Sequence, residues 1–211
     1  MNPSAPRRRS DALANRQKIL AAAAVVYSEE GLGVTLDRIA RAAGVGVGTV
    51  YRNFSNKSEL IDAVLAERLE AIMELARSCA AEEDPREGLF RFLRTVGGWI
   101  KDSMALGQLL EGRGESQDSM LAARDEFIPL LAELIERAQR RELIRADFSV
   151  LDLPMFFTML GAIQKRTGRV DPGQVDRYLE MLLDAVAHPP TVPAHPSLTE
   201  AQFREIFTRQ R

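Results

Sequence analysis

Residues 34–54, VTLDRIARAAGVGVGTVYRNF, constrain the fold of this 211-residue chain more than any other stretch. Thr35 is a residue type that caps helices, because its hydroxyl can accept a backbone N–H of the first turn. Apolar residues then recur at the helical spacing i, i+3, i+4 and i+7, and Gly44 can end the helix in the left-handed conformation. A second short helix is expected over about residues 47–54. The segment therefore predicts a helix-turn-helix.

The second of these helices is expected to have two different faces. Val50 and Phe54 are four residues apart and can both face the core. The outer face is then small, polar and basic, which suits the major groove of DNA. Base contacts are expected from Val47, Gly48 and Arg52, whereas an asparagine in the place of Asn53 more often positions the protein than reads a base. Arg52 can bind a guanine through two hydrogen bonds or bind a phosphate, and the sequence leaves both open.

The order and spacing of residues in the first third of the chain resemble the tetracycline-repressor (TetR) family of bacterial transcription regulators. The resemblance rests on Ile19, Ala22, Ala23, Tyr27, Gly31, Thr35, Ile39, Ala40, Gly44, Val45, Gly48, Thr49, Val50, Tyr51, Phe54, Lys57 and Leu60. Many members carry serine where this chain has Gly46. Glycine caps a helix nearly as well, but it brings no hydroxyl to a phosphate.

The resemblance implies phosphate contacts from the hydroxyls of Thr49 and Tyr51 and from the ammonium of Lys57. The alternative is a buried Tyr51 with Thr49 and Lys57 merely solvated. The full DNA-binding set expected from the segment and the resemblance is Thr35, Val47, Gly48, Thr49, Tyr51, Arg52, Asn53 and Lys57.

Charge is distributed unevenly along the chain. The net charge of the whole chain is −2, but residues 1–60 hold nine Lys and Arg against five acids. A basic N-terminal module on an acidic remainder favours attraction of phosphates to one end of the molecule. The triple arginine at 7–9 is expected to coat phosphates or enter the minor groove, or else to be a solvated tail.

The pattern of apolar residues predicts an all-α fold, because no stretch of alternating polarity is long enough for a strand. An N-terminal three-helix DNA-binding domain should precede a helical domain for ligand binding and dimerisation. The expected division is a disordered basic arm at 1–10, the DNA-binding domain at 11–57 (about 12–72 by family, with the motif at 35–54), an effector-binding and dimerisation domain at 58–187, and a proline-rich linker with a short terminal helix at 188–211.

Two helices near the end of the second domain, over about 151–166 and 172–187, predict a homodimer. The first is apolar on more than one side and therefore needs more than one packing partner. In the family these two helices form a four-helix bundle with the second subunit. The expected interface residues are Phe156, Leu160, Tyr178, Leu179 and Leu182. The alternative is that these residues form an ordinary monomer core.

The resemblance also implies a pocket for a small, largely apolar effector. Gly97 and Gly98 within one expected helix and Pro129 within another suggest local room for it. The candidate lining residues are Phe92, Trp99, Met104, Phe127 and Phe157, although an aromatic at helical spacing is more often an ordinary core residue.

The remaining signals narrow the class of protein. The chain carries no glycine-rich phosphate loop, no G-x-S-x-G elbow and no Cys–His pair, so an enzyme, a cofactor and a metal site are not expected. Its apolar runs are too short for a membrane span, and a single cysteine, Cys79, suits the reducing cytoplasm. The sequence thus predicts a cytoplasmic, ligand-responsive repressor that binds a palindromic operator. A transcriptional activator, or a helical small-molecule binding protein without DNA-binding activity, is the alternative.

Overall fold

The computed structural model describes residues 5–110, 117–187, 198–199 and 201–202, with side chains from residue 13 onward and, in the seventh α-helix, from residue 127 onward. Every regular element within these ranges is a helix, which confirms the predicted all-α fold. The elements are α1 (Ala5–Glu30), α2 (Leu36–Ala43), α3 (Val47–Asn53), α4 (Lys57–Ala80), α5 (Pro85–Asp102), α6 (Met104–Leu110), α7 (Gln117–Arg140), the 3-10 turn η1 (Val150–Asp152), α8 (Leu153–Thr167) and α9 (Gly173–Ala187).

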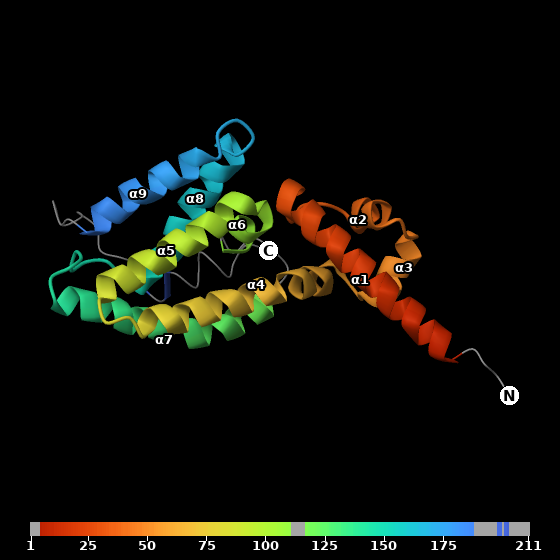
Figure 1. The fold of residues 1–211 in the computed structure, drawn as a ribbon, viewed down its shortest axis with the longest axis horizontal. Coiled ribbons are helices and arrows are strands. Elements are labelled where there is room, and N and C mark those ends of the chain that lie inside the picture. The colour runs from red at the N-terminus through yellow and green to blue at the C-terminus, as the bar shows by residue number, and fades with distance from the viewer. Residues whose placement is uncertain (1–4, 111–116, 188–197, 200, 203–211) are drawn as a thin grey trace.

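The molecule has a small head, α1 to α3, at one end of a longer body, α4 to α9 (Figure 1). Helix α4 starts beside the head and runs the length of the body, where it packs on α5 and α7. Helix α5 lies between α4 and the pair α8–α9, and contacts all three. The body is therefore layered, with α4 and α7 on one side of α5 and the two last helices on the other.

The core of the head comes from side chains that the helical spacing predicts to face inward. Ile19 and Tyr27 of α1, Ile39 of α2, and Val50 and Phe54 at α3 are each fully buried. Burying side chains of this size stabilises a small domain by about 1.5–3 kcal/mol each. The expected inward positions of Val50 and Phe54 are confirmed.

The first helix begins earlier than the sequence predicts. Residues 5–10, expected to belong to a disordered arm, form the first turns of α1. Pro6 permits this start, because a proline in the first turn of a helix removes only an N–H that has no partner within the helix. At the other end of the chain, Thr199 and Gln202 form the predicted reciprocal cap, at 3.0 and 3.3 Å. The rest of the proposed terminal helix lies outside the described residues.

Helix α6 joins the head to the body at the end of α1. Gln108 Oε1 accepts the backbone N–H of Leu32 at 2.6 Å, and Ser28 Oγ donates to the carbonyl of Asp102 at 3.0 Å. The Gln108 amide sits close to Gly31, where a Cβ would lie 2.7 Å from Nε2. Gly31 also has a φ of +81°, which L-residues with side chains rarely adopt. Glycine at this position therefore allows both the turn and the close contact.

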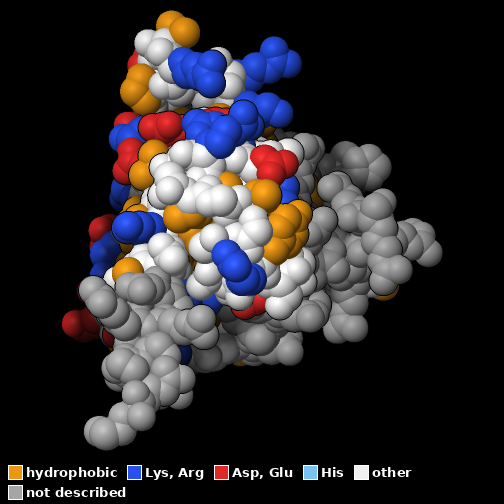
Figure 2. Space-filling view, turned by 90° about the vertical axis from the view of Figure 1, so that its right-hand side faces the viewer, with side chains coloured by type: hydrophobic (Ala, Val, Ile, Leu, Met, Phe, Trp, Pro, Cys, Tyr) orange, Lys and Arg blue, Asp and Glu red, His pale blue; other side chains and the backbone are white. Residues whose placement is uncertain are grey.

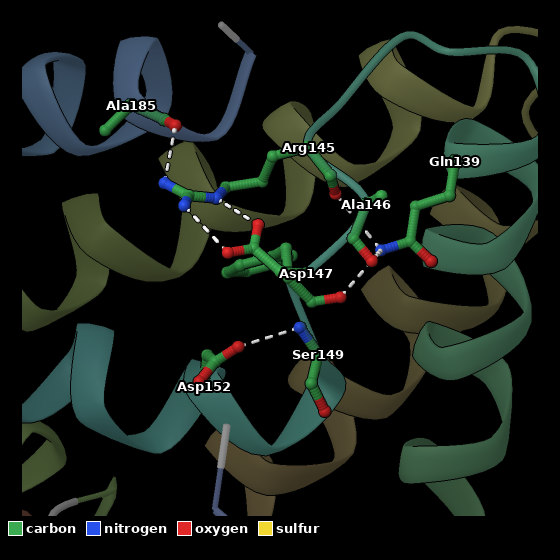
Figure 3. A network of polar contacts seen from close by, with 8 residues as sticks. Gln139, Arg145, Ala146, Asp147, Ser149, Asp152 and Ala185 are labelled. Atoms are coloured by element: carbon green, nitrogen blue, oxygen red, sulfur yellow. Dashed lines mark hydrogen bonds and ion pairs between the residues drawn. The ribbon is translucent and has the colours of Figure 1, made fainter. Parts of the chain in front are cut away.

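A polar network ties the segment between α7 and η1 to the end of α9 (Figure 3). Arg145 binds the carboxylate of Asp147 with two hydrogen bonds, at 2.5 and 2.8 Å, and its Nη1 donates to the carbonyl of Ala185. Gln139 Nε2 lies within 3.1 Å of three backbone carbonyls of this segment. A cation at the C-terminus of α9 also complements the helix dipole.

Replacing Asp147 by Asn is expected to make folding less sensitive to acid. The guanidinium of Arg145 holds the pKa of Asp147 below its ordinary value. A carboxyl with a lowered pKa contributes stability that is fully present above its unfolded pKa and is lost as the pH falls through its folded pKa. Urea unfolding from about pH 7 down to about pH 2 should show a larger loss of free energy for the wild type than for D147N. Identical losses would contradict the assignment.

Candidate nucleic-acid interface

The turn between α2 and α3 is built from the residues that the sequence singles out. Thr35 Oγ1 accepts the N–H of Arg38 at 3.3 Å and so caps α2. Gly44 ends α2 in the left-handed conformation, with φ +66°. Gly46 then caps α3 in an extended conformation without a side-chain hydrogen bond. Thr35 thus has a structural role, and a contact between Thr35 and DNA stays a prediction.

Helix α3 presents a distinct outer face. The side chain of Tyr51 is 57% exposed and that of Val47 is 40% exposed, while Gly48 and Arg52 are also at the surface. A Cβ at Gly48 would meet nothing within 4 Å, so this side of the helix is open to a large partner. The exposure of Tyr51 excludes the alternative in which its ring belongs to the core. Four of the predicted DNA-binding residues therefore share one accessible surface.

Thr49 organises the other polar side chains of α3. Arg52 Nη2 donates to Thr49 Oγ1 at 2.9 Å, and Asn53 Nδ2 donates to the Thr49 carbonyl at 2.8 Å. Because the Asn53 amide is bound to its own helix and is half-buried, it is suited to stabilising α3 rather than to reading a base. The Arg52 guanidinium has five N–H donors, so the bond to Thr49 leaves others for a base or a phosphate.

The start of α4 lies directly after α3 and is held by reciprocal bonds. Asn56 Oδ1 accepts the N–H of Glu59 at 2.8 Å, and Glu59 Oε2 accepts the N–H of Ser55 at 2.7 Å. The bonds from Ser55, aided by the nearby Arg16 cation, lower the pKa of Glu59. Lys57 is the first residue of α4 and is half-exposed. A helix N-terminus with a cation beside it is a favourable environment for a phosphate.

Seen from the head end, Lys and Arg side chains crowd the upper part of the molecule, and a few others lie lower down among apolar and uncharged groups (Figure 2). Arg38 is paired with Glu30 at 2.6 Å, which reduces its free charge. Arg52 and Lys57 have no ion pair among the described contacts, so their charges are available to a polyanion. The head thus joins an exposed helix face to local positive charge.

The structure brings together only some of the effector-pocket candidates. Phe92 and Phe157 are buried and pack edge to face, with ring centroids 6.4 Å apart. Trp99 is half-buried, and the guanidinium carbon of Arg68 lies 4.8 Å from its ring centroid. Met104 and Phe127 are half-buried. Phe92 and Phe157 therefore contact each other as core residues do, and a ligand role for any of the five stays a prediction.

The two adjacent glycines of α5 have different surroundings. A Cβ at Gly97 would lie 2.7 Å from Leu179 Cδ2, so α9 fills the space beside this residue. A Cβ at Gly98 would meet nothing within 4 Å. The two glycines are expected from the sequence to leave local space for an effector. There is unfilled space beside Gly98, but Leu179 occupies the space beside Gly97.

Three of the predicted dimer residues are buried within their own protomer, which is the alternative of an ordinary monomer core. Phe156, Leu160 and Leu179 are at most 9% exposed and belong to the core of their own protomer. Leu160 and Leu179 face α5 near Gly97, and the Phe156 ring packs on that of Phe148, with ring centroids 5.5 Å apart. Tyr178, at 42% exposure, and the half-buried Leu182 remain on the outer side.

Helix α9 carries two apolar stripes, an inner one and an outer one. The inner stripe is Val175, Leu179, Leu183 and Val186, all buried. The outer stripe, at spacings of three and four residues, is Tyr178, Met181, Leu182 and Ala185. Met181 is 53% exposed, and Met159 of α8 is 42% exposed. These two methionines are outward apolar residues that a separate count of each helical face would have identified.

Comparison with known proteins extends the resemblance beyond the head. Residues 19–64 match the model of bacterial regulatory proteins of the tetR family, and residues 84–188 match the model of the C-terminal domain of SbtR-like transcriptional regulators. The HTH-type transcriptional regulator SAB2452 of Staphylococcus aureus (strain bovine RF122 / ET3-1) is 45% identical over 53 residues. That match spans 25% of this chain and 29% of the relative's length, so it bears on only a part of either protein.

Two solved structures cover far more of the chain. A TetR transcription regulatory protein from Mycobacterium vanbaalenii is 33% identical, with 85% of this chain and 99% of that chain covered and a TM-score of 0.49. RolR, solved with the ligand resorcinol, is 18% identical, with 95% and 96% covered and a TM-score of 0.52, and shows the fold alone. No helix among the described residues is both long enough and apolar enough to cross a membrane. The two family models together match most of the chain, and the chain belongs to the TetR family of transcriptional regulators.

Proposed function

We propose that this protein is a DNA-binding transcriptional repressor that acts as a homodimer in the cytoplasm and responds to a small-molecule effector. The single observation that carries the proposal is the outer face of α3, where Tyr51 and Arg52 are exposed next to Lys57 at the start of α4. A protruding, open helix with hydroxyl and cationic groups suits a major groove and its flanking phosphates.

The alternatives differ in what the head does. A small-molecule binding protein without DNA-binding activity has no use for an exposed Tyr51 and for an Arg52 held by Thr49. A transcriptional activator would bind DNA by the same surface, and only the effect on transcription separates it from a repressor. The outer α3 face therefore supports DNA binding more strongly than it supports the sign of regulation.

Dimerisation is supported by the outer stripe of α9 together with Met159. Exposed apolar side chains at helical spacing on two neighbouring helices form a surface that a second copy can cover by two-fold symmetry. We place Tyr178, Met181 and Leu182 at the centre of this interface. The inner stripe supports them from the protomer core.

The effector is proposed to be largely apolar and to act through α4. This helix has 24 residues and spans about 36 Å, so a single rigid element connects Lys57 with the body. A ligand in the body that favours a different tilt of α4 would change the spacing of the two α3 helices in the dimer. A typical coupling of about 1–3 kcal/mol corresponds to a change in operator affinity of roughly 5- to 150-fold.

Selection of bound fragments from genomic DNA tests the proposal. A two-fold dimer should select imperfect palindromes whose half-sites are about 34 Å apart, or a multiple of that spacing. The recovered operator also identifies neighbouring genes and thereby candidate effectors. Recovery of no enriched sequence would favour the small-molecule binding protein, and enriched sites without two-fold symmetry would exclude the dimer.

Lys57→Ala and Arg52→Ala are expected to affect DNA binding in different ways. K57A should weaken binding to all sequences alike and reduce the slope of log affinity against log salt by about 1, because it removes a phosphate contact. R52A should relax the preference for one base in each half-site, a contribution of about 1–3 kcal/mol. Lys165→Ala, an exposed cation on α8, serves as the control and should change neither quantity. If R52A keeps the wild-type preference, Arg52 contacts only phosphate.

A further inference from the structure

Arg16 of α1 makes two contacts at the end of α3. Its Nη1 donates to the carbonyl oxygen of Asn53 at 2.9 Å. Its guanidinium carbon lies 4.3 Å from the centroid of the Phe54 ring, which is fully buried. The Arg16 side chain is itself half-buried. Arg16 is therefore directed at the helix rather than extended into solvent.

Both contacts strengthen the attachment of the end of α3 to the rest of the head. The last carbonyls of a helix have no partner within it, and α3 has only seven residues, so the Asn53 carbonyl is one of a few groups available to anchor its end. A cation over an aromatic ring adds a second attraction. Helices this short depend on tertiary contacts rather than on intrinsic propensity for their stability.

The start of α4 is also within the influence of Arg16. Its charge contributes to the lowered pKa of Glu59, whose carboxylate accepts the N–H of Ser55. The guanidinium thus lies where α1, the end of α3 and the first turn of α4 meet. These are the elements that set the orientation of Arg52 relative to Lys57.

We propose that Arg16 is a positioning residue for DNA recognition: its guanidinium fixes α3 and the first turn of α4 in one geometry without contacting DNA. This inference rests on the proposed DNA-binding function for its consequence, but its structural part can be tested on the free protein. The contact joins residues 37 positions apart in the chain, so local spacing gives no sign of it.

Hydrogen exchange of the free protein tests the structural part. In Arg16→Ala, the amides of residues 49–54 should exchange about ten- to a hundredfold faster, the range expected for loss of a hydrogen bond to a charged group. Amides of α5, α8 and α9 should keep their wild-type rates, which separates local release of α3 from general destabilisation. Lys18→Ala removes a cation from an exposed position on the same helix and should leave α3 protected. Wild-type protection of α3 in R16A would overturn the proposal.

A double-mutant cycle on duplex DNA tests the consequence. R16A should lower affinity for the selected operator by about tenfold. The double variant R16A/R52A should lose less than the product of the two single losses, because displaced α3 already weakens the Arg52 contact. Losses that multiply independently would show that Arg16 contacts DNA by itself and would overturn the positioning role. If the wild type binds no DNA while R16A still accelerates hydrogen exchange in α3, the proposed DNA-binding function is wrong. The structural role of Arg16 in holding α3 is then still supported.

Discussion

Gly88→Ala is expected to destabilise the fold by about 2–3 kcal/mol, which is large for the addition of one methyl group. A Cβ at Gly88 would lie 2.5 Å from the carbonyl oxygen of Cys79 and 3.0 Å from Glu82 Cβ. The first of these atoms is backbone at the end of α4, so it cannot turn away as a side chain can. The substitution must therefore separate α5 from α4 at the point where the two helices meet.

The connection between α4 and α5 has little freedom to absorb this change. Arg137 of α7 donates to the carbonyls of Ala80 and Glu82, each at 2.6 Å, and so fixes the turn from outside. A shift that relieves the clash at Gly88 would break these charge-assisted bonds. The expected loss already allows for the gain of about 1 kcal/mol that alanine brings to a helix interior.

Gly98→Ala is the matched control, in the same helix and with the same change of one methyl group. No atom lies within 4 Å of the Cβ at Gly98, so only the helix propensity remains and the protein should gain about 1 kcal/mol. Urea unfolding of both variants measures the difference. Equal stabilities of G88A and the wild type would show that α4 and α5 can move apart at low cost, contrary to this packing.

Met181→Glu is expected to convert the proposed dimer to monomers and to lower operator affinity by about two orders of magnitude or more. The side chain of Met181 is 53% exposed in the protomer, so a carboxylate there meets water while the protein is monomeric. In the dimer the same carboxylate would be buried among apolar groups without a partner, which is costly. A monomer presents one head instead of two and loses the gain from simultaneous binding.

Ala66→Glu provides the control for added charge, because Ala66 is exposed on α4. That variant should remain dimeric and bind DNA like the wild type. Light scattering gives the oligomeric state, and a gel-shift assay on the selected operator gives the affinity. A dimeric, DNA-binding M181E would place the interface elsewhere. Leu179→Glu should instead unfold the protomer, since Leu179 faces α5 and is 3% exposed.

The features that the sequence predicts well are set by neighbouring residues. Thr35 and Gly44 delimit α2 as expected, because a cap depends on the hydrogen bonds and backbone angles of its own turn. The burial of Val50 and Phe54 also follows from helical spacing within one short segment, whereas spacing alone left the exposure of Tyr51 open. Most of the head could therefore be placed from sequence alone.

The features that the sequence misses depend on where distant helices pack. The spacing of apolar residues on α9 shows that the helix is apolar on more than one side, but it does not show which stripe packs against α5. Leu179 and Met181 differ in burial only because α5 occupies one side. The contact from Arg16 to the Asn53 carbonyl likewise requires that α1 lie beside α3. Such pairings follow from tertiary geometry, which a single sequence does not specify.

The close contact between Gly31 and Gln108 limits which heads of related regulators can be grafted onto this body. If a grafted head had any residue other than glycine at position 31, the Cβ of that residue would lie only 2.7 Å from Nε2 of Gln108. The Gln108 amide would then have to move. Displacing Gln108 would leave the N–H of Leu32, a residue only 6% exposed, without its acceptor, at a cost of about 1–3 kcal/mol. A chimaeric regulator built on this body should therefore keep glycine at position 31 and glutamine at position 108 as a pair, even when every base-contacting residue is replaced.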